Sequence, residues 1–314
     1  MTPSLQRHLA SLAGVEARFD EAMSHHTTYK VGGRAAAFLD ISSVTALETA
    51  LAALADGETP YVILGNGSNV LFADAGFSGA VIHLGRGLDA VSHEASAPGA
   101  HVLTAGAGLS ITRLLRYAKE HALAGLECLG GVPGTVGGAI RMNAGTRLGE
   151  VKDSLLAAQL VAPGRPRRWV DAEDLSLSYR HSALPEGSVV TAGRFKVTDA
   201  SPEMWQRLEE VLTYRKRTQP LTMPSCGSVF ANPPGDAAGR LIEAAGLKGH
   251  RVGGAEVSRQ HANWIINTGE ATASNVRELI EICVSTVRER FGLTLRHEVQ
   301  FLGDWTSLTG ESNG

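Results

Sequence analysis

Glycines crowd one nearly uncharged stretch in mid-chain, residues 129–145, which reads LGGVPGTVGGAIRMNAG. Without a Cβ, a glycine lets main-chain N–H groups come close to a flat or anionic ligand. Glycine inside a helix or strand costs about 0.5–1 kcal/mol relative to alanine, so we expect neither element here. A plain surface loop is the alternative, but loops beyond about 12–15 residues are uncommon and usually functional. The stretch is therefore predicted to form the wall of a cofactor site.

A second candidate for ligand binding is the turn at residues 65–69, Gly-Asn-Gly-Ser-Asn, which follows a short apolar run. Its glycines and short polar side chains can present several N–H groups to one phosphate. It is not a dinucleotide fingerprint, because Val70 stands where the third glycine of Gly-x-Gly-x-x-Gly belongs. The same half-match recurs at residues 106–111. Together the two turns indicate nucleotide binding by a fold other than the Rossmann fold.

Strands and helices must position these turns, and hydrophobic periodicity predicts where they lie. Residues 1–24 are expected to be a poorly patterned lead-in with one short helix near residues 6–13. Further along, we expect strands at 37–41, 61–64, 101–105, 155–161, 167–170 and 188–197, and helices at 43–55, 110–121 and 205–217.

Pro220 and Pro224 then break the chain, which indicates a domain boundary. Beyond them the pattern predicts helices at 237–245 and 274–291, the second ended by Gly292, and strands at 255–257, 264–267 and 293–302.

Composition excludes several classes of protein. With 314 residues, 43% apolar and 19% charged, the chain is long enough for two or three globular domains. Its net charge of −3 gives no basic field for nucleic acid or an anionic membrane, and no apolar run is long enough to span one. Three scattered cysteines suggest neither a disulfide framework nor a zinc site, and His25-His26 lacks a third ligand nearby. We therefore expect a cytoplasmic protein without a metal.

Several motifs in order make the chain resemble the UDP-N-acetylenolpyruvoylglucosamine reductase (MurB) family of peptidoglycan synthesis. The resemblance spans residues 26–303. The motifs are LGNGSN at 64–69, GVPGTVGG at 131–138, MNAG at 142–145, Tyr179-Arg180-x-Ser182, GSVFxNP at 227–233, AGLKG at 245–249, and Glu298-Val299. Little room lies between Pro233 and Gly239 for an extra loop with a substrate-binding tyrosine, so the chain resembles the shorter type of this family.

The resemblance implies an α+β protein, in which a two-subdomain FAD-binding fold of the vanillyl-alcohol-oxidase type is joined to a C-terminal α/β substrate domain. We expect FAD-binding subdomains at 1–84 and 85–218, a substrate-binding domain at 219–303, and a tail at 304–314. FAD is expected to be bound without a covalent link, since no histidine lies in the glycine turn or wall. The cofactor-binding residues so implied are Leu64, Gly65, Asn66, Gly67, Ser68, Asn69, Gly131, Pro133, Gly134, Thr135, Gly137, Gly138, Asn143, Ala144 and Gly145.

The implied reaction is a relay in which NADPH reduces FAD and a hydride then passes to the enolpyruvyl double bond of UDP-N-acetylglucosamine enolpyruvate, giving UDP-N-acetylmuramate. Carbanion character beside a carboxylate needs stabilising groups and a proton donor. Arg180 and Glu298 match the family's catalytic arginine and glutamate, and Ser228 matches its proton donor. The substrate-binding candidates are Tyr179, Asn232, Lys248 and His261.

Two other functions remain open from the sequence. A flavin oxidase of the same fold would often carry a histidine linked to FAD, which is not seen in either glycine segment. A non-catalytic flavin sensor would have no need of an arginine, a serine and a glutamate at catalytic positions. The expected partners are the two small-molecule substrates alone, and the expected state is a monomer.

Overall fold

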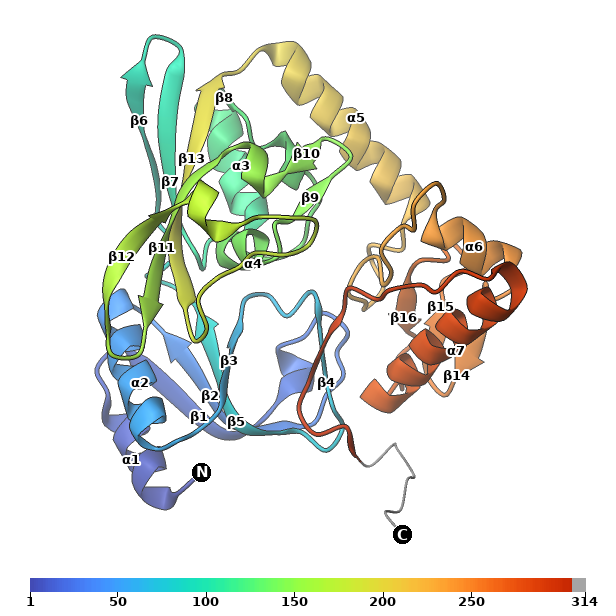
Figure 1. Cartoon of the computed structure of the whole chain (residues 1–314), viewed down its shortest axis with the longest axis horizontal. Helices are drawn as coiled ribbons and strands as arrows, with labels where there is room; N and C mark the ends of the chain where they lie inside the picture. The colour runs from blue at the N-terminus through green and yellow to red at the C-terminus, as the bar shows by residue number, and fades with distance from the viewer. Residues whose placement is uncertain (307–314) are drawn as a thin grey trace. The chain divides into compact units, whose positions relative to one another are not determined.

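The computed structural model describes residues 1–306, which divide into two compact units (Figure 1). The first unit comprises residues 1–19, 37–66 and 79–214, and the second comprises residues 20–36, 67–78 and 215 onward. The three consecutive domains expected from the sequence, bounded at 84, 218 and 303, stay a prediction. Most of the expected tail, from residue 307, lies outside the described residues.

Most of a four-stranded sheet of order β1-β2-β5-β3 belongs to the first unit. Its elements are α1 (Pro3–Ser11), β1 (Val15–Ala22), β2 (Arg34–Ile41), α2 (Val44–Asp56), β3 (Tyr61–Leu64) and β5 (Phe77–Leu84). Strands β3 and β5 are parallel, and α2 begins after Ser43, whose hydroxyl accepts from the Ala46 N–H at 3.1 Å. The predictions of β2, α2 and β3 are confirmed.

Strand β1 corrects the prediction that residues 1–24 form a lead-in with only one short helix. Val15, Ala17 and Phe19 alternate with polar residues and pack against the first unit's core. This period of two is the pattern of a half-buried strand. The helix before it is α1, which starts and ends a little earlier than expected.

A six-stranded antiparallel sheet forms the rest of the first unit (Figure 1), in the order β12-β11-β13-β7-β6, with β8 on β13. The larger elements are β6 (Val91–Ala97), β7 (Ala100–Gly106), α3 (Ile111–Glu120), β11 (Leu155–Ala162), β12 (Arg165–Asp171), β13 (Val189–Asp199) and α5 (Pro202–Thr218). The shorter ones are β8 (Leu123–Ala124), α4 (Val136–Arg141), β9 (Gly145–Thr146) and β10 (Gly149–Glu150). All six elements predicted between residues 101 and 217 are confirmed.

Helix α4 corrects the expectation that the glycine-rich stretch holds neither helix nor strand. Thr135 caps it, its hydroxyl accepting from the Gly138 N–H at 3.4 Å. A Cβ on Gly137 would lie 2.9 Å from the Cβ of Ala107, so this glycine is needed for close packing against the loop after β7. Tertiary contact therefore offsets the intrinsic cost of glycine in a short helix.

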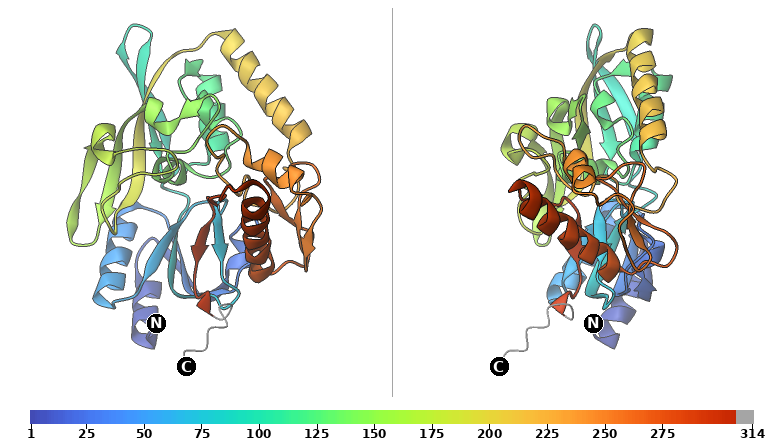
Figure 2. Two further views of the ribbon diagram at one scale, coloured as in Figure 1. Left: turned by 45° about the vertical axis from the view of Figure 1, so that its right-hand side comes forward. Right: turned by 90° about the vertical axis from the view of Figure 1, so that its right-hand side faces the viewer.

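The second unit has its own core around a long helix. Helix α7 (Ala273–Phe291) packs on the small antiparallel sheet of β14 (Arg251–Val252), β15 (Ala255–Val257) and β16 (Ile265–Asn267), beside α6 (Ala238–Ala244) (Figure 2). Gly292, with φ of +69°, ends α7 as predicted. Strand β4 (Val70–Phe72) pairs in parallel with β17 (Gln300–Leu302).

Strand β17 is much shorter than the strand predicted at 293–302. Residues before it make single hydrogen bonds instead of a ladder: the Ala231 N–H donates to Arg296 O, and the Glu298 N–H donates to Val229 O. The apolar residues Leu295 and Val299 are buried in the core without regular pairing. The apolar pattern that predicted a longer strand therefore reflects the burial of these side chains and not strand pairing.

Within residues 1–306, no helix is long and apolar enough to cross a membrane, and no three side chains of His, Cys, Asp or Glu are grouped to hold a metal ion.

Asp74 anchors the start of α7, and its loss should destabilise the second unit. Its carboxylate accepts from the N–H groups of Ala273 (2.8 Å) and Ser274 (2.9 Å) and from the Ser274 hydroxyl (2.6 Å). Asp74→Ala should lower the free energy of unfolding by about 1–2 kcal/mol, as expected for a lost helix cap. Urea denaturation measures this loss. Ser274→Ala, which removes one of the three bonds, should cost less, and equal losses would contradict this account.

Candidate functional site

A cavity of about 370 Å³ in the second unit brings together four of the predicted site residues. It is lined by Ser228, Asn232, Ala237, Gly239, Arg240, Glu243, Lys248, Gln260, His261, Ala262 and Asn263. The size is that of a small-molecule site, and the lining is mostly polar. Ser228, Asn232, Lys248 and His261 were all selected from the sequence.

Ser228 is exposed to this cavity while the two residues after it are buried. Val229 and Phe230 are 0% and 2% exposed. Gly227, just before, has φ of +83°, a conformation that glycine adopts at little cost. The turn thus presents one hydroxyl on a segment whose next residues are fixed in the core.

Two ion pairs line the cavity. Lys248 Nζ lies 2.8 Å from the Glu243 carboxylate on α6, and Arg240 pairs with Asp236. Asn232 Oδ1 accepts from the N–H of Ala238 at 3.0 Å, at the start of α6, which leaves its amide nitrogen as the group that can donate to a ligand. The cavity can therefore bind oxyanions and hydrogen-bond acceptors.

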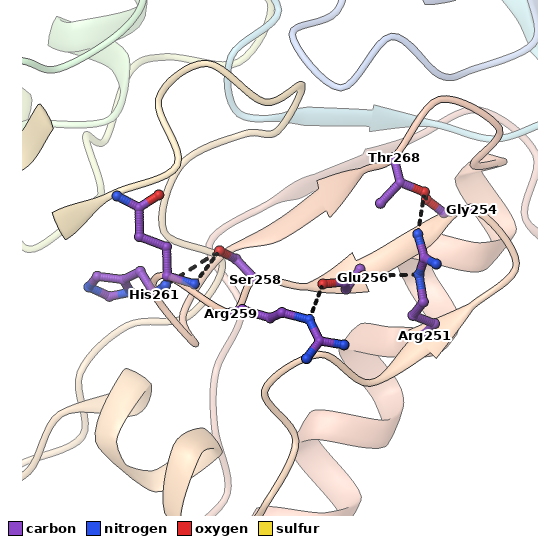
Figure 3. Close-up of polar contacts among 8 residues, drawn as sticks. Arg251, Gly254, Glu256, Ser258, Arg259, His261 and Thr268 are labelled. Carbon is purple, nitrogen blue, oxygen red and sulfur yellow. Dashed lines mark hydrogen bonds and ion pairs between the residues drawn. The ribbon is translucent and has the colours of Figure 1, made fainter. Parts of the chain in front are cut away.

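His261 is held by a turn after β15 that Figure 3 shows in detail. The buried Ser258 hydroxyl accepts from the main-chain N–H groups of Gln260 (3.2 Å) and His261 (3.3 Å). Nearby, the Glu256 carboxylate pairs with Arg251 at 2.9 Å and Arg259 at 3.3 Å, which braces β14 and β15. The imidazole therefore projects from a rigid part of the second unit.

The protonation of His261 follows from its surroundings. Its Nδ1 accepts from the Asn263 N–H at 3.2 Å, so in the neutral ring the proton sits on Nε2. Burial lowers the pKa of His261, and the positive charges of Lys248 and Arg215 lower it further. The negative charge of Glu243 opposes this shift but does not reverse it, so at neutral pH the residue is an uncharged hydrogen-bond donor.

Glu298 lies in the same unit on the segment beside Ser228, but it is not among the residues lining the cavity. Its main-chain N–H donates to Val229 O at 2.8 Å, and its carbonyl accepts from Asn69 Nδ2 at 3.0 Å. The side chain is half-buried. Both main-chain groups of Glu298 are thus hydrogen-bonded, and one of these bonds reaches Val229, the residue after Ser228.

Arg180 belongs to the first unit and sits at the tip of a tight turn. Ser178 and His181 exchange main-chain hydrogen bonds of 3.0 Å in both directions, and Arg180 has φ of +54°. Left-handed backbone is rare for a long side chain and often marks a functional position. The guanidinium donates to Gly145 O at 3.0 Å and lies 5.2 Å from the centre of the Tyr179 ring, which is itself exposed.

Asn143 supports that turn from beneath. It is fully buried, and its amide nitrogen donates to Ser178 O and to the Glu150 carboxylate, both at 2.9 Å. Its Oδ1 accepts from the Lys152 N–H at 2.9 Å. Its expected place at the cofactor stays a prediction, and in the structure its amide holds the Arg180 turn.

The first two residues of the glycine turn adjoin the glycine wall within the first unit. A Cβ on Gly65 would lie 2.5 Å from the Thr135 hydroxyl, and Asn66 Nδ2 donates to Gly134 O at 3.3 Å. Gly131 and Gly138 lie on the exposed side of the wall. A Cβ on Gly138 would meet nothing nearer than the Thr135 hydroxyl at 3.7 Å, so the backbone there is open to a ligand. An exposed glycine face of this kind fits FAD.

The remaining cofactor candidates fall on both sides of the division. Leu64, Pro133, Ala144 and Gly145 are in the first unit, and Gly67, Ser68 and Asn69 are in the second. A Cβ on Gly67 would approach His26 O to 2.1 Å, and a Cβ on Gly145 would approach Gly149 O to 2.2 Å. These two glycines are required for backbone packing, whatever else they do.

Sequence reasoning missed Gln260, Asn263, Arg240 and Glu243, which line the cavity. For Gln260 and Asn263 the signal available was the polar run before the apolar strand at residues 264–267, whereas Arg240 and Glu243 lie on the short helix α6. Nothing in that run distinguishes a lining residue from an ordinary turn, because the contacts that matter reach residues about 30 positions away along the chain, such as Phe230.

Comparisons with known proteins agree with this geometry. Residues 35–164 match a model described as an FAD binding domain, and residues 219–302 match the C-terminal domain of UDP-N-acetylenolpyruvoylglucosamine reductase. The reductase of Myxococcus xanthus is 42% identical over 303 residues, 96% of this chain and 97% of the relative. That of Syntrophobacter fumaroxidans is 40% identical, covering 94% and 86%.

Among solved structures, the MurB reductase of Thermus caldophilus has a TM-score of 0.77 at 37% identity, covering 92% of this chain and 98% of that one. The expected α+β fold with an FAD-binding part is confirmed. The short passage from Pro233 to α6, at Ala238, agrees with the shorter type. By sequence and by fold, then, the chain belongs to the UDP-N-acetylenolpyruvoylglucosamine reductase (MurB) family.

Proposed function

We propose that this protein reduces UDP-N-acetylglucosamine enolpyruvate to UDP-N-acetylmuramate for peptidoglycan synthesis, with Ser228, Arg180 and Glu298 as catalytic residues. The observation that carries the proposal is the cavity, because Ser228, Lys248 and a neutral His261 all line it. Such a cavity offers a proton beside groups suited to a charged sugar nucleotide.

The exposed face of the glycine wall and the turn at 65–69 would hold FAD, which would supply the hydride once NADPH had reduced it. The protein's own work lies in the second half of the reaction. Hydride addition at the terminal carbon of the enolpyruvyl group leaves negative charge on the carbon beside the carboxylate. Arg180 stabilises that enolate-like state by its positive charge, and Glu298 matches the family's catalytic glutamate.

The Ser228 hydroxyl then gives its proton to the carbon beside the carboxylate, and one proton taken up from the solvent restores the serine hydroxyl. A hydroxyl is a weak acid, but a carbanion is a strong base, so this transfer is favourable. Lys248 and the amide nitrogen of Asn232 hold the diphosphate, while the Nε2–H of His261 and the ring of Tyr179 contact other parts of the substrate. We further propose a monomer that works in the cytoplasm.

The oxidase and sensor alternatives are less well supported. A sensor would gain nothing from a left-handed arginine turn fixed by a buried asparagine, or from a serine held at the mouth of a polar cavity. An oxidase would need no site for a nucleotide diphosphate.

FAD should come off the denatured protein, because no histidine lies in either glycine segment. Unfolding the yellow protein and filtering it should pass all of the flavin absorbance into the filtrate. Colour that stays with the polypeptide would contradict a non-covalent cofactor.

Ser228→Ala should slow only one half of the reaction. Reduction of the bound flavin by NADPH should stay within about twofold of the wild type, since no proton donor is needed there. Flavin reoxidation by the enolpyruvyl substrate should slow by about 10²–10⁴-fold, the usual cost of losing a positioned acid. Stopped-flow absorbance follows each half separately.

Ser228→Cys is the matched variant, because a thiol can still supply a proton. It should recover part of the loss. Equal slowing of both halves in Ser228→Ala would assign the residue to the fold or the flavin site instead.

Lys248→Met should raise the KM for the UDP-sugar by about 10- to 100-fold, the effect of losing a hydrogen bond to a charged group. The rise should appear in KM because the lost binding is the same in ground and transition states. The NADPH half-reaction should be nearly unchanged, since the UDP-sugar takes no part in it.

Glu243→Gln serves as the control. It removes the ion pair seen at 2.8 Å but keeps the positive charge of Lys248. If Lys248 binds the diphosphate, this variant should leave KM unchanged or lower it, because a competing carboxylate is gone. A rise in KM as large as that of Lys248→Met would mean that the pair acts only in the fold.

A further inference from the structure

Asn263 clamps the main chain immediately after Ser228. Its Nδ2 donates to Phe230 O at 2.8 Å, and its Oδ1 accepts from the Phe230 N–H at 2.9 Å. Its own carbonyl accepts from the Val229 N–H at 2.8 Å. One residue therefore makes three hydrogen bonds to two consecutive residues.

The opposite side of the same segment is held by the backbone of residues 296–298. Val229 O accepts from the Glu298 N–H at 2.8 Å, and the Ala231 N–H donates to Arg296 O at 3.0 Å. Residues 229–231 thus lie between Asn263 on one side and this backbone on the other. On the Asn263 side, two of the three bonds come from a side chain.

An asparagine amide suits this position for a physical reason. Phe230 is 2% exposed, and a buried main-chain N–H or C=O without a partner costs about 1–3 kcal/mol. The segment is not part of a regular strand, so no neighbouring strand supplies both partners. The side-chain amide carries one donor and one acceptor and can satisfy both Phe230 groups at once.

From this contact we propose that Asn263 is a positioning residue for the reduction, which sets where the Ser228 hydroxyl stands in the cavity. The inference rests on the proposed role of Ser228 as proton donor. Ser228 is exposed and is fixed mainly through its neighbours, so movement of Val229 and Phe230 would displace its hydroxyl. A misplacement of about 1 Å can cost a reaction on the order of 10²-fold.

Asn263 also lines the cavity, but its 5% exposure and its engaged amide argue against a direct role in holding substrate. The bond from its main-chain N–H to His261 Nδ1 does not involve the side chain. Replacing the side chain should therefore leave the substrate contacts of His261 and Lys248 in place.

The same unit offers a matched control in Asn267. It is also 5% exposed, and its amide also serves main-chain groups: Nδ2 donates to Tyr29 O at 2.9 Å, and Oδ1 accepts from the N–H groups of Gly269 (2.8 Å) and Ala271 (3.1 Å). None of these bonds involves residues 228–231. Asn267→Ala therefore removes comparable bonds without touching the Ser228 segment.

The experiment compares Asn263→Ala, Asn267→Ala, Ser228→Ala and the double variant of Asn263 and Ser228, each with FAD bound. Asn263→Ala should slow flavin reoxidation by the enolpyruvyl substrate by about 10- to 100-fold. The NADPH half-reaction, and the substrate Kd measured by flavin absorbance, should change by less than about threefold. Asn267→Ala should lower the melting temperature similarly and leave both half-reactions within about threefold.

The double variant carries the decisive test. If Asn263 works through Ser228, adding Asn263→Ala to Ser228→Ala should slow reoxidation by no more than about threefold further, because the positioned hydroxyl is already gone. Full additivity would overturn the role of Asn263 and leave that of Ser228 intact. A wild-type rate in Ser228→Ala would overturn the proposed function, and this inference with it.

Asn263→Asp keeps the experiment decisive if the alanine variant does not fold. It has nearly the same shape, keeps the acceptor for the Phe230 N–H, and loses the donor to Phe230 O. It should slow reoxidation selectively. Equal slowing of the two half-reactions would assign Asn263 to the fold alone.

Discussion

Irregular backbone that carries a functional side chain must still satisfy its buried polar groups, and much of the site depends on this constraint. Neither Ser228 nor Arg180 lies on a helix or strand. In the second unit a buried asparagine supplies the partners, because Asn263 bonds both main-chain groups of Phe230. In the first unit Ser178 and His181 bond each other, and buried Asn143 adds one more bond to Ser178 O. The Asn263 amide thus does for its segment what neighbouring strands do elsewhere in the molecule.

Close backbone packing is the second requirement, and it decides where glycine stands. Gly137 lies against Ala107, and Gly67 against the carbonyl of His26, at distances that admit no side chain. Gly138, one residue from Gly137, is instead exposed and open. Adjacent glycines in the wall therefore serve different ends, one for packing and one for access, although they look alike in the sequence.

Periodic elements were predictable because their signal is local. Helix α7 and strand β15 follow directly from spacing, and Gly292 marks the helix end by its need for a left-handed residue. The misses have the opposite cause. Helix α4 depends on contact with Ala107, far along the chain, and residues 293–299 carry buried apolar side chains without a strand partner.

The residues of the site also divide into those that the sequence predicted and those that only the fold reveals. Ser228, Asn232, Lys248 and His261 were reached through motifs and line one cavity, whereas Asn263 and Glu243 could not be found without the fold. Each acts through a partner, and no regular sequence spacing predicts that pairing. Asn263 bonds Phe230, and Glu243 pairs with Lys248.

The pairing of Lys248 with Glu243 has a further consequence for the chemistry of the cavity. Lys248 is 31% exposed and Glu243 58%, so water screens the pair and its net stabilisation is small. An incoming oxyanion can therefore take over Lys248 at little cost, while Glu243 turns to solvent. His261 does not compete for that anion as a cation, because burial and the charge of Lys248 lower its pKa and keep it neutral. Charge recognition and hydrogen-bond donation are thereby divided between two neighbouring side chains.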